Sequence, residues 1–459
     1  MCRKNLIKVL VLVLAMVMLL STTAFSIDRY EQMPHDYGIV FIDDLLVDAE
    51  FTDYLTYQLH AEFGEQFMHN HDIAVMTVDF IYDAFPVSRS GETMYPDSFG
   101  GMYIDDDGNL VILMVEYCQF NRVRAYEYAI NVEYAIAGNA STRVVEFSYI
   151  ELKSVFQVVA DFIFANWSDY SCPLVYNLVS VGVSAKDNSV RVSLLDTSPH
   201  QIDLFKAAII DHPAIDFIQI DGRREFFDED VHDLYYDAYS SDSAELIQPF
   251  NTVVVHPGTT IRRHQGSVVG SIGFRARLGS LNGFVTAAHS VTNINQVFLS
   301  TGREIGQVRA RHTLSDSAFV SFSPGVSMSN RNPSANAFPV TQAALAQANF
   351  VQGRVVSRVS EGGREDSGDA RHPITSTGRI DGTGEQLDNH GFGPMLAFRA
   401  NYLATNGDSG GIILAHGYGS DFRIAGIHVG NRRVQQGQDP ISYFSSVNRI
   451  TSGLGISLN

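Results

Sequence analysis

A histidine, an aspartate and a serine stand in that order in the second half of the chain, each within a motif suited to chemistry. His289 ends the run Thr286-Ala287-Ala288-His289, and Asp316 begins the apolar run Asp316-Ser317-Ala318-Phe319-Val320. Ser409 lies within Gly407-Asp408-Ser409-Gly410-Gly411. A serine hydroxyl becomes a nucleophile when a base accepts its proton and a carboxylate fixes the tautomer of that base. We therefore predict that these three side chains form a catalytic triad for acyl transfer.

The glycines of the third motif indicate where negative charge on the reacting carbonyl is stabilised. A tight turn lets the backbone N–H groups of Gly407 and Ser409 converge on one oxygen atom and form an oxyanion hole. Losing one such donor typically costs about 2.7–4 kcal/mol of transition-state stabilisation. Each motif alone is compatible with a turn or a buried core residue. Their joint occurrence in this order favours the catalytic interpretation.

The string Gly407-x-Ser409-x-Gly411 also satisfies the nucleophile elbow of α/β-hydrolases, which order their triad serine, acid, histidine. Asp421 and His428 follow Ser409 in that order. Only 50 residues follow the serine, however, which is too few for the strand–helix units of such a sheet. No βαβ pattern precedes Ser409 either, so this alternative fails.

The elements that must position the triad are short strands. Residues 251–459 are rich in Gly, Ser, Val and Arg, with apolar runs such as Val268–Phe274, Gln296–Leu299 and Ala318–Phe322 between turn residues. Many short strands at such spacing indicate an all-β sandwich or barrel. One helix is expected near the end, at Phe444–Ser452.

Two α+β units are predicted ahead of this region, at residues 27–145 and 146–222. The first has a helical period over Phe51–Phe67 and a hairpin of Gly101–Ile104 and Leu110–Val115. The second contains two helices and three strands in the pattern helix, hairpin, helix, strand. Its predicted elements are Phe147–Trp167, Tyr176–Val183, Val190–Leu195, Leu204–Ile210 and Ile215–Ile220.

No metal site or cofactor is predicted. The turn Asp105-Asp106-Asp107-Gly108-Asn109 lacks the ligand spacing and the distal glutamate of an EF-hand loop, so we interpret it as a hairpin turn. His69 and His71 form an isolated pair with no nearby cysteine or third histidine. We expect that pair to lie in a solvated loop.

The N-terminus has the features of a secretory signal peptide, predicted at residues 1–26. Arg3, Lys4 and Lys8 precede an apolar run of 12 residues, Val9–Leu20, and Ala24-Phe25-Ser26 offers a cleavage site. Twelve helical residues span about 18 Å of a hydrocarbon core of roughly 30 Å, so a membrane anchor is the weaker alternative. We expect a secreted protein that meets a membrane only during export.

The net charge of −19 conceals two halves of opposite sign. Residues 1–250 carry 39 acidic and 14 basic side chains, whereas residues 251–459 carry 12 acidic and 18 basic ones, all arginine. Such halves attract each other. The arginines are scattered without a basic run, so we predict no nucleic-acid partner. Residues 223–250 are predicted to be an acidic, cleavable linker, with Glu229 and Glu245 as conceivable cut sites.

The chain from residue 251 resembles the chymotrypsin-like serine proteases, and within them the streptogrisin and alpha-lytic protease branch. The motifs around His289, Asp316 and Ser409 carry this resemblance, together with Val268–Phe274 and the ending Ser446–Leu458. It implies two perpendicular six-stranded β-barrels with the triad at their junction, all-β, preceded by an α+β pro-region. The pro-region is similar to theirs through Phe99–Ile104 and the Tyr176–Leu195 hairpin, which implies an intramolecular chaperone and inhibitor.

The sequence departs from this family at two cysteine positions and leaves the specificity pocket open. Ser290 and Thr405 stand where the family has cysteines, and no cysteine follows Cys172, so the barrels have no internal disulfide. The pocket is predicted to include Leu403, His428, Val429 and Gly430, and Leu403 argues against a preference for Lys or Arg. His428 resembles a residue of glutamyl endopeptidases that contacts an acidic side chain. The alternative is a strand histidine bonded locally.

Together these features predict a secreted serine endopeptidase, made as a zymogen with a domain at 251–459 that cleaves proteins or peptides. A preference for Glu or Asp before the scissile bond is the finer hypothesis. The alternative from another class is a catalytically inactive, protease-like binding protein.

Overall fold

The structure is a computed structural model that describes residues 59–89, 93–115, 140–169, 171–220, 252–264, 266–329, 341–345, 350–367, 375–390, 393–418, 421–432 and 440–458. All of them belong to one compact unit, Val47–Asn459. The predicted signal peptide and acidic linker lie outside the described residues, as do Cys2 and Cys118. Cys172 is described and has a free thiol. No helix in the described ranges is long and apolar enough to span a lipid bilayer.

The first α+β unit pairs a long helix with a small sheet. Helix α3 (Glu65–Ala84) packs against β1 (Phe99–Ile104) and β2 (Leu110–Val115). Strand β3 (Ser141–Val145) completes the sheet, in which β1–β2 is antiparallel and β2–β3 parallel. The carboxylate of Asp105 accepts the N–H groups of Asp107 and Asn109, and Gly108 has a φ of 84°. The predicted hairpin is therefore confirmed, and its first aspartate holds the turn.

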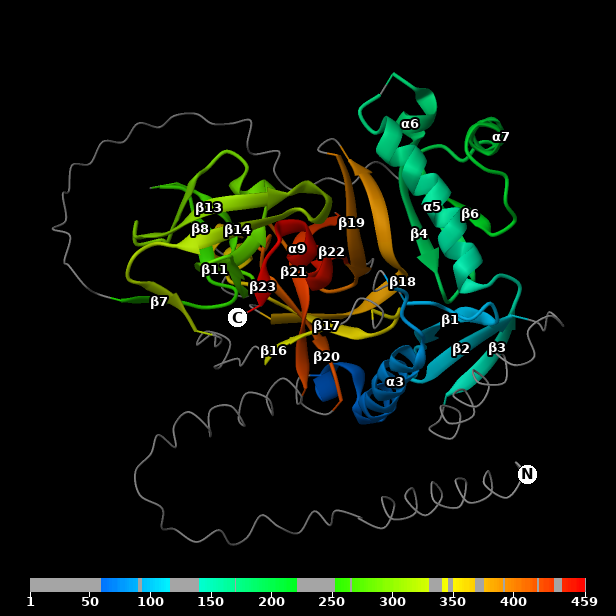
Figure 1. The fold of residues 1–459 in the computed structure, drawn as a ribbon, viewed down its shortest axis with the longest axis horizontal. Coiled ribbons are helices and arrows are strands. Elements are labelled where there is room, and N and C mark those ends of the chain that lie inside the picture. The colour runs from blue at the N-terminus through cyan, green and yellow to red at the C-terminus, as the bar shows by residue number, and fades with distance from the viewer. Residues whose placement is uncertain are drawn as a thin grey trace, which may run out of the picture. The chain divides into compact units, whose positions relative to one another are not determined.

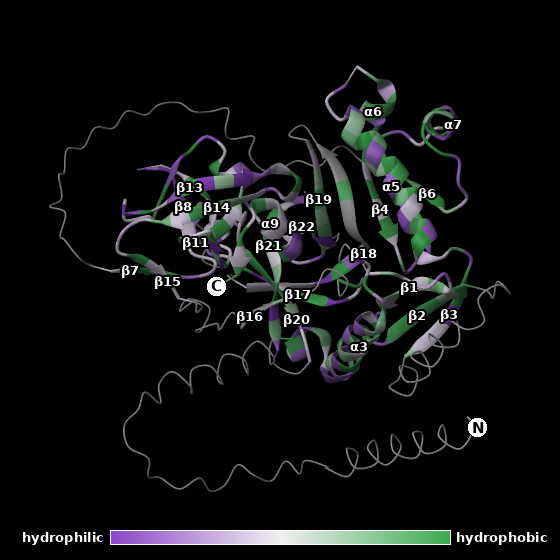
Figure 2. Ribbon diagram, in the orientation of Figure 1, coloured by the Kyte–Doolittle hydropathy of each residue, from purple (hydrophilic) through white to green (hydrophobic). Residues whose placement is uncertain are grey.

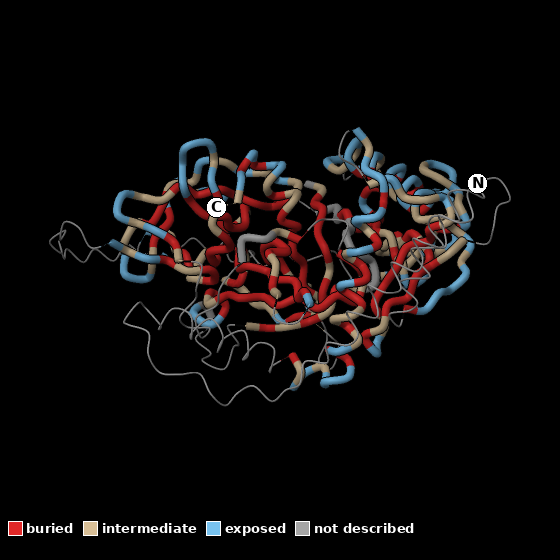
Figure 3. Tube along the Cα trace, turned by 60° about the horizontal axis from the view of Figure 1, so that its bottom comes forward, coloured by how far each residue is buried: buried red, intermediate tan, exposed pale blue. Residues whose placement is uncertain are grey.

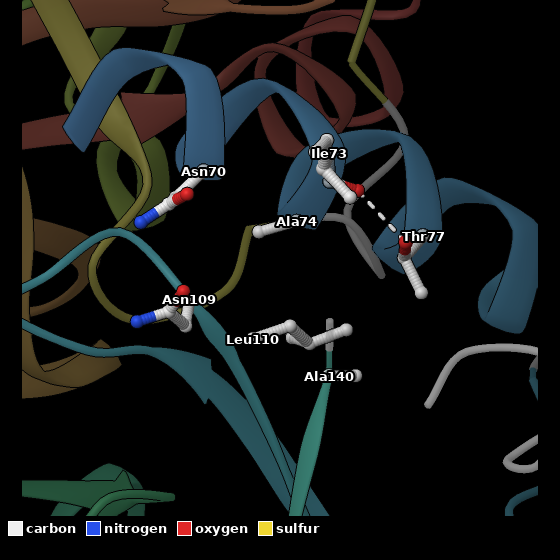
Figure 4. A pocket seen from close by; sticks show the side chains of 7 residues that line it. All are labelled: Asn70, Ile73, Ala74, Thr77, Asn109, Leu110 and Ala140. Carbon is white, nitrogen blue, oxygen red and sulfur yellow. Dashed lines mark hydrogen bonds between the residues drawn. The ribbon is translucent and has the colours of Figure 1, made fainter. Parts of the chain in front are cut away.

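One face of α3 covers the sheet. Figure 4 shows a small pocket in which Ala74 of α3 lies near Leu110 and Ala140, while the Thr77 hydroxyl donates to the Ile73 carbonyl oxygen at 2.7 Å. The hydrophobic core under the helix includes Val75, Val78 and Ile81.

The predicted solvated loop around His69 and His71 is wrong, because both residues lie in α3. Residues two apart in a helix point in different directions. His69 is exposed, whereas His71 is 0% exposed. Within the predicted helix over Phe51–Phe67, residues 59–63 are helical and residues 65–67 begin α3, whereas residues 51–58 lie outside the described part.

The second unit places helices beside three strands. Strands β4 (Leu178–Ser184) and β5 (Ser189–Leu194) are antiparallel, and β6 (Ile215–Gln219) joins β5 in parallel. The remaining elements are the helices α5 (Tyr149–Asn166), α6 (Pro173–Asn177) and α7 (Pro199–Ala208). Figure 2 shows that α5 carries both hydrophobic and hydrophilic residues, and Leu152, Val155 and Val159 are its buried ones. The predicted order of elements is confirmed with two shifted ends. Tyr176 and Asn177 lie in α6, where Pro173 starts a short helix, and α7 runs from Pro199 to Ala208 rather than from Leu204 to Ile210.

The third region begins with a β-barrel. Its sheet has the strand order β23-β10-β11-β14-β13-β12-β8-β9, and a short turn connects β9, at one end of the path, with β10, next to the other end. Phe284, Val320 and Ile305 are fully buried inside it. The strands are β8 (Thr260–Arg262), β9 (Val268–Ser271), β10 (Arg275–Leu278), β11 (Leu281–Ala287), β12 (Gln296–Phe298), β13 (Glu304–His312), β14 (Ser317–Phe322) and β23 (Ser457–Leu458). A parallel pair, β7 (Val253–Val255) and β15 (Val326–Met328), forms a separate small sheet.

The second barrel is a closed ring. Its strands pair in the order β17-β20-β21-β22-β19-β18, and β18 pairs again with β17. They are β17 (Val355–Val359), β18 (Thr375–His390), β19 (Gly393–Ala400), β20 (Ile412–His416), β21 (Phe422–Arg432) and β22 (Ile441–Ser446). Strand β16 (Thr341–Ala344) adds to β21, and α8 (Gly362–Ser367) follows β17. The predicted double β-barrel is confirmed.

The final helix, α9 (Val447–Leu454), ends at Gly455, whose φ of 63° suits a helix C-terminus. It starts later than predicted, because Phe444–Ser446 still belong to β22.

The α+β region and the second barrel share a sheet. Strand β4 pairs antiparallel with β18 through Gly182↔Gln386, Val181↔Leu387 and Ser180↔Asp388. The two strands lie side by side in Figure 1. Figure 3 shows long buried stretches of chain with exposed segments at the loops. The strands of the second barrel therefore continue without a break into the second α+β unit.

Candidate active site

His289 and Asp316 lie close together because His289 follows β11, Asp316 precedes β14, and these two strands are paired. Strand β11 pairs with β14 through Ala287↔Ser317, so the residues just beyond this end of the pair are neighbours. The Nδ1 atom of His289 lies 2.5 Å from Oδ2 of Asp316, and the backbone N–H of His289 donates to Oδ1 at 2.9 Å. Both side chains are mostly buried, at 18% and 12% exposure. The carboxylate therefore fixes the ring and leaves Nε2 as the available base.

The turn that presents Asp316 has an unusual backbone. Asp316 has a φ of 40°, in the left-handed region, and ends the 3-10 turn η3 (Thr313–Ser315). Its carbonyl oxygen accepts the N–H of Ala288 at 2.9 Å. A non-glycine residue in this region persists when its surroundings determine its position. The hydrogen bonds to Ala288 and His289 do so here.

The loop carrying Ser409 lies against strand β9, which in turn contacts the strand that leads to His289. Ser271 of β9 donates its N–H to the Ser409 carbonyl oxygen at 2.7 Å and its hydroxyl to the Gly407 carbonyl oxygen at 2.9 Å. The Ser271 carbonyl oxygen in turn accepts the Thr286 hydroxyl at 2.8 Å. The first barrel thus holds both the Ser409 loop and the start of the histidine motif through one residue.

Two amides of the Ser409 loop are available as an oxyanion hole. Asp408 and Gly410 donate their N–H groups to Thr405 and His428, whereas within the described ranges the amides of Gly407 and Ser409 donate to no acceptor. Gly407 has a φ of 83°, and a Cβ there would come within 2.6 Å of Gly362 backbone carbon. Only glycine fits at this position.

A fully buried ion pair holds the loop that carries Ser409. Arg358 of β17 lies 3.0 Å from the Asp408 carboxylate, and both side chains are 0% exposed. Asp408 also accepts the N–H groups of Gly363 and Thr405 at 3.0 and 2.9 Å. Arg358 donates to the carbonyl oxygen of Leu403 at 2.9 Å. The residue before Ser409 is thereby held at several points.

Sequence analysis missed Arg358 and gave Asp408 no role. The signal was present in the run Val355-Val356-Ser357-Arg358-Val359, where an arginine interrupts an apolar strand. A charged side chain in a buried strand requires a partner, and the partner is often functional.

The predicted pocket residues divide into two groups. His428 is 1% exposed and its Nδ1 lies 2.9 Å from the Tyr402 hydroxyl, while its backbone hydrogen-bonds with Gly410 and Gly411. Val429 packs into the barrel core, so only its backbone can face a substrate. Leu403 is 53% exposed.

Burial lowers the pKa of His428 to about 3, with Arg358 and His289 adding to the effect and Asp408 opposing it. Burial likewise raises the pKa of Tyr402 well above its usual range. His428 is therefore neutral at ordinary pH. Its ring therefore carries no charge to attract an acidic side chain before substrate binds.

Two family profiles match the α+β region. The profile described as "Pro-like N-terminal domain" matches residues 59–129, and that described as "Pro-like C-terminal domain" matches residues 151–220. The chain carries a Pro-like region ahead of a double β-barrel. No curated protein matches the chain by sequence.

Solved structures match the barrels at low identity. They include protease A of Thermobifida fusca (21% identity, 45% of this chain and 98% of that one, TM-score 0.35) and a Nocardiopsis protease (21%, 45% and 100%, 0.35). A third is a glutamic acid-specific serine protease described as using a histidine triad in substrate binding (22%, 45% and 100%, 0.36). TM-scores this low carry no weight for function, and the double barrel rests on the strand pairing above.

Proposed function

We propose that the chain is the precursor of an exported serine endopeptidase. His289 Nε2 accepts the Ser409 proton as Oγ attacks the peptide carbonyl carbon, and the protonated histidine then gives that proton to the departing amine. Water hydrolyses the resulting acyl-enzyme by the same route in reverse. The observation that carries this proposal is the buried His289–Asp316 pair beside the Ser409 loop.

The loop geometry supports stabilisation of the tetrahedral intermediate. The free amides of Gly407 and Ser409 supply the two donors that an oxyanion requires. Asp408, held by Arg358, fixes the backbone between them. Because these donors are in place before substrate arrives, little reorganisation is needed during the reaction.

The Pro-like region supports synthesis as a zymogen. Strand β4 extends the sheet of the second barrel, and acidic residues of the first unit pair with barrel arginines. We propose that this region assists folding of the barrels and inhibits them until it is cut away. Export through the N-terminal signal peptide is part of the same proposal, because it rests on the sequence pattern of residues 1–26.

For specificity, we propose a preference for Glu or Asp before the scissile bond. The Tyr402 hydroxyl lies 2.9 Å from His428 Nδ1 and 3.3 Å from the Tyr443 carbonyl oxygen. Tyr402 can therefore donate to Tyr443 and accept from His428, an arrangement that a protonated His428 ring can keep when it meets a carboxylate. A bound carboxylate would raise the depressed pKa of His428.

Hydrolysis kinetics of the processed protein test the catalytic proposal. Ser409→Ala and His289→Ala are expected to abolish peptide cleavage, and Asp316→Asn to lower kcat by about 10⁴-fold through loss of the correct tautomer. Ser452→Ala, an exposed serine of α9, is the control and should retain full activity. A wild-type protein that is folded and processed but does not hydrolyse any peptide of a broad library would favour a binding protein.

A peptide series that differs only before the scissile bond tests the specificity proposal. Glu and Asp peptides should be cleaved with higher kcat/KM than Gln, Phe or Leu peptides, and His428→Phe should remove that difference. Equal or better cleavage after Phe or Leu in the wild-type protein would contradict it.

A further inference from the structure

Two buried histidines meet where α3 packs against the second barrel. His71 of α3 is 0% exposed, and His416, which ends β20, is 2% exposed. Their ring centroids lie 5.5 Å apart. Asp72 of α3 lies 2.9 Å from Nε2 of His416. This cluster lies outside the candidate active site, and the proposed reaction does not use it.

The hydrogen bonds define the protonation state of His71. The backbone N–H of Val355 in β17 donates to His71 Nε2 at 3.0 Å. Nε2 must therefore hold a lone pair, so the single proton of the neutral ring is on Nδ1. Among the described residues, Nδ1 is buried and has no hydrogen-bond partner. His71 thus forms its contact with the barrel as a neutral acceptor.

A second proton on His71 would remove this contact. The new N–H at Nε2 would face the N–H of Val355, donor against donor, and the hydrogen bond between α3 and β17 would be lost. A buried cation would also be created beside Arg354 and Arg379. Burial, followed by His416 and these two arginines, lowers the pKa of His71 well below its usual range.

The charged groups packed around His71 come from every neighbouring element, and each acid already faces another base. Asp79 of α3 pairs with Arg354 at 3.6 Å and with Arg423 of β21 at 3.5 Å. Asp421 pairs with Arg423 at 2.8 Å, Asp106 with Arg379 of β18 at 3.1 Å, and Asp72 with His416. A positive charge on His71 would therefore lie among other basic side chains, and every nearby carboxylate would already be paired with one of them.

A divalent metal ion suits the cluster less well than a proton. His71, Asp72 and His416 offer ligand atoms within 4.8 Å of one another, which is a common metal arrangement. Coordination through His71 Nδ1 would, however, require removal of the only proton of the ring while Nε2 still accepts from Val355. The ion would also lie near Arg354 and Arg379. These requirements disfavour a cation with two charges.

We propose that His71 makes the seating of α3 on the second barrel sensitive to pH, so that acid releases the first α+β unit from the barrel. Away from the barrel, His71 takes up a proton near its ordinary pKa of about 6.5. While α3 is packed on the barrel, the buried ring of His71 resists protonation. Below about pH 6.5 the seated state therefore weakens by about tenfold per pH unit. This device goes beyond the proposed protease function and does not depend on the reactivity of Ser409.

Hydrogen exchange of the full chain carrying Ser409→Ala tests the proposal without any catalytic activity. Protection of peptides spanning 65–84 and 354–359 is measured from pH 5 to pH 8 and corrected for the intrinsic exchange rate. We expect protection to fall by about tenfold per pH unit below pH 6.5 in both peptides. Strands β11 and β14 of the first barrel serve as the internal reference and should stay protected.

Matched variants assign the effect. His71→Gln, whose amide oxygen can accept from Val355, is expected to remove the pH dependence. His69→Gln, an exposed histidine of the same helix, should behave as the parent chain. If His71→Gln leaves α3 unprotected at every pH, the resonance of His71 is followed by NMR in the parent chain. A titration near pH 6.5 in the seated state overturns the proposal, and protonation only at much lower pH supports it.

Two further results would also overturn it. The pH dependence could survive in His71→Gln and disappear in His416→Gln, which would assign the proton to His416. Alternatively, zinc ion added at pH 7 could raise the protection of α3 in the parent chain but not in His71→Gln, which would make the cluster a metal site.

Discussion

Arg354 and Arg358 lie four positions apart at strand β17. Both side chains are 0% exposed, but they have different kinds of partner. Arg358 pairs with Asp408 within the barrel, at 3.0 Å, and Asp408 is itself 0% exposed. Arg354 pairs with Asp79 of α3, at 3.6 Å, and Asp79 is 23% exposed. One pair belongs to the barrel permanently, and the other exists while the Pro-like region is seated.

The difference separates catalysis from assembly. The Arg358–Asp408 pair holds the backbone that presents Ser409, and nothing in it depends on α3. Arg354 instead joins His416 and Arg423 in a basic surface that the acidic face of α3 covers. The barrel can therefore keep its active-site geometry while its contact with the Pro-like region responds to conditions.

The largest effect is expected from breaking the permanent pair. Asp408→Asn leaves Arg358 buried without its counter-charge and should destabilise the full chain by about 3–5 kcal/mol. Chemical denaturation measures this loss. Replacing both residues, as in Arg358→Met with Asp408→Ala, should restore much of the stability, and a double variant no more stable than Asp408→Asn would contradict the assignment.

Breaking the pair between Arg354 and Asp79 should cost less stability, and the loss should be confined to the contact of α3 with the barrel. Asp79→Asn removes a charged partner of Arg354 and should weaken the seating of α3 by about 1.5–3 kcal/mol. Hydrogen exchange should report this loss in the peptides spanning 65–84 and 354–359, while β11 and β14 of the first barrel stay protected. Asp83→Asn, at the end of the same helix, is the control; equal loss in both variants would show a general effect of helix charge.

The pH dependence of the barrel sharpens the comparison, because His428 lies beside the permanent pair. Its pKa is lowered to about 3, so the unfolded chain binds a proton below about pH 6.5 and the folded barrel does not. Stability is full well above that pH and falls as pH decreases, by roughly 1 kcal/mol between pH 6.5 and 5.5. His428→Gln should remove this part of the slope in denaturation experiments, and an unchanged slope would contradict the burial of a neutral ring.

The smallest effect on stability is expected at Ser290, which stands where chymotrypsin-like proteases have a cysteine. The Ser290 hydroxyl is buried and has no hydrogen-bond partner in the described part of the chain. Ser290→Ala should therefore stabilise the protein, by about 1 kcal/mol. Ser315→Ala is the contrasting variant, because its hydroxyl bonds to His312 and Ser317 and its loss should destabilise. Thermal unfolding separates the two signs.

The sequence was sufficient where chemistry and structure are both local. The motifs of His289 and Asp316 sit at the ends of neighbouring strands, and the hairpin of β1 and β2 follows from its turn residues. The barrels follow from many short strands. For these parts, the information lies within a few residues along the chain.

Other features depend on contacts between distant segments. The pairing of β4 with β18 joins residues about 200 positions apart, and no local pattern specifies its register. The prediction of a solvated loop at His71 is wrong because two histidines alone in the sequence do not indicate that one of them accepts a hydrogen bond from the distant Val355 backbone. Arg358 was detectable as a charge within an apolar strand, but its partner Asp408 was not.

Reaction of the processed protein with a fluorophosphonate, followed by peptide mapping, tests the central claim most directly. The account predicts one adduct on Ser409, formed in the wild-type protein and in Ser452→Ala, and absent from His289→Ala. A folded, processed wild-type protein that stays unlabelled, or that is labelled equally after His289→Ala, would contradict the account.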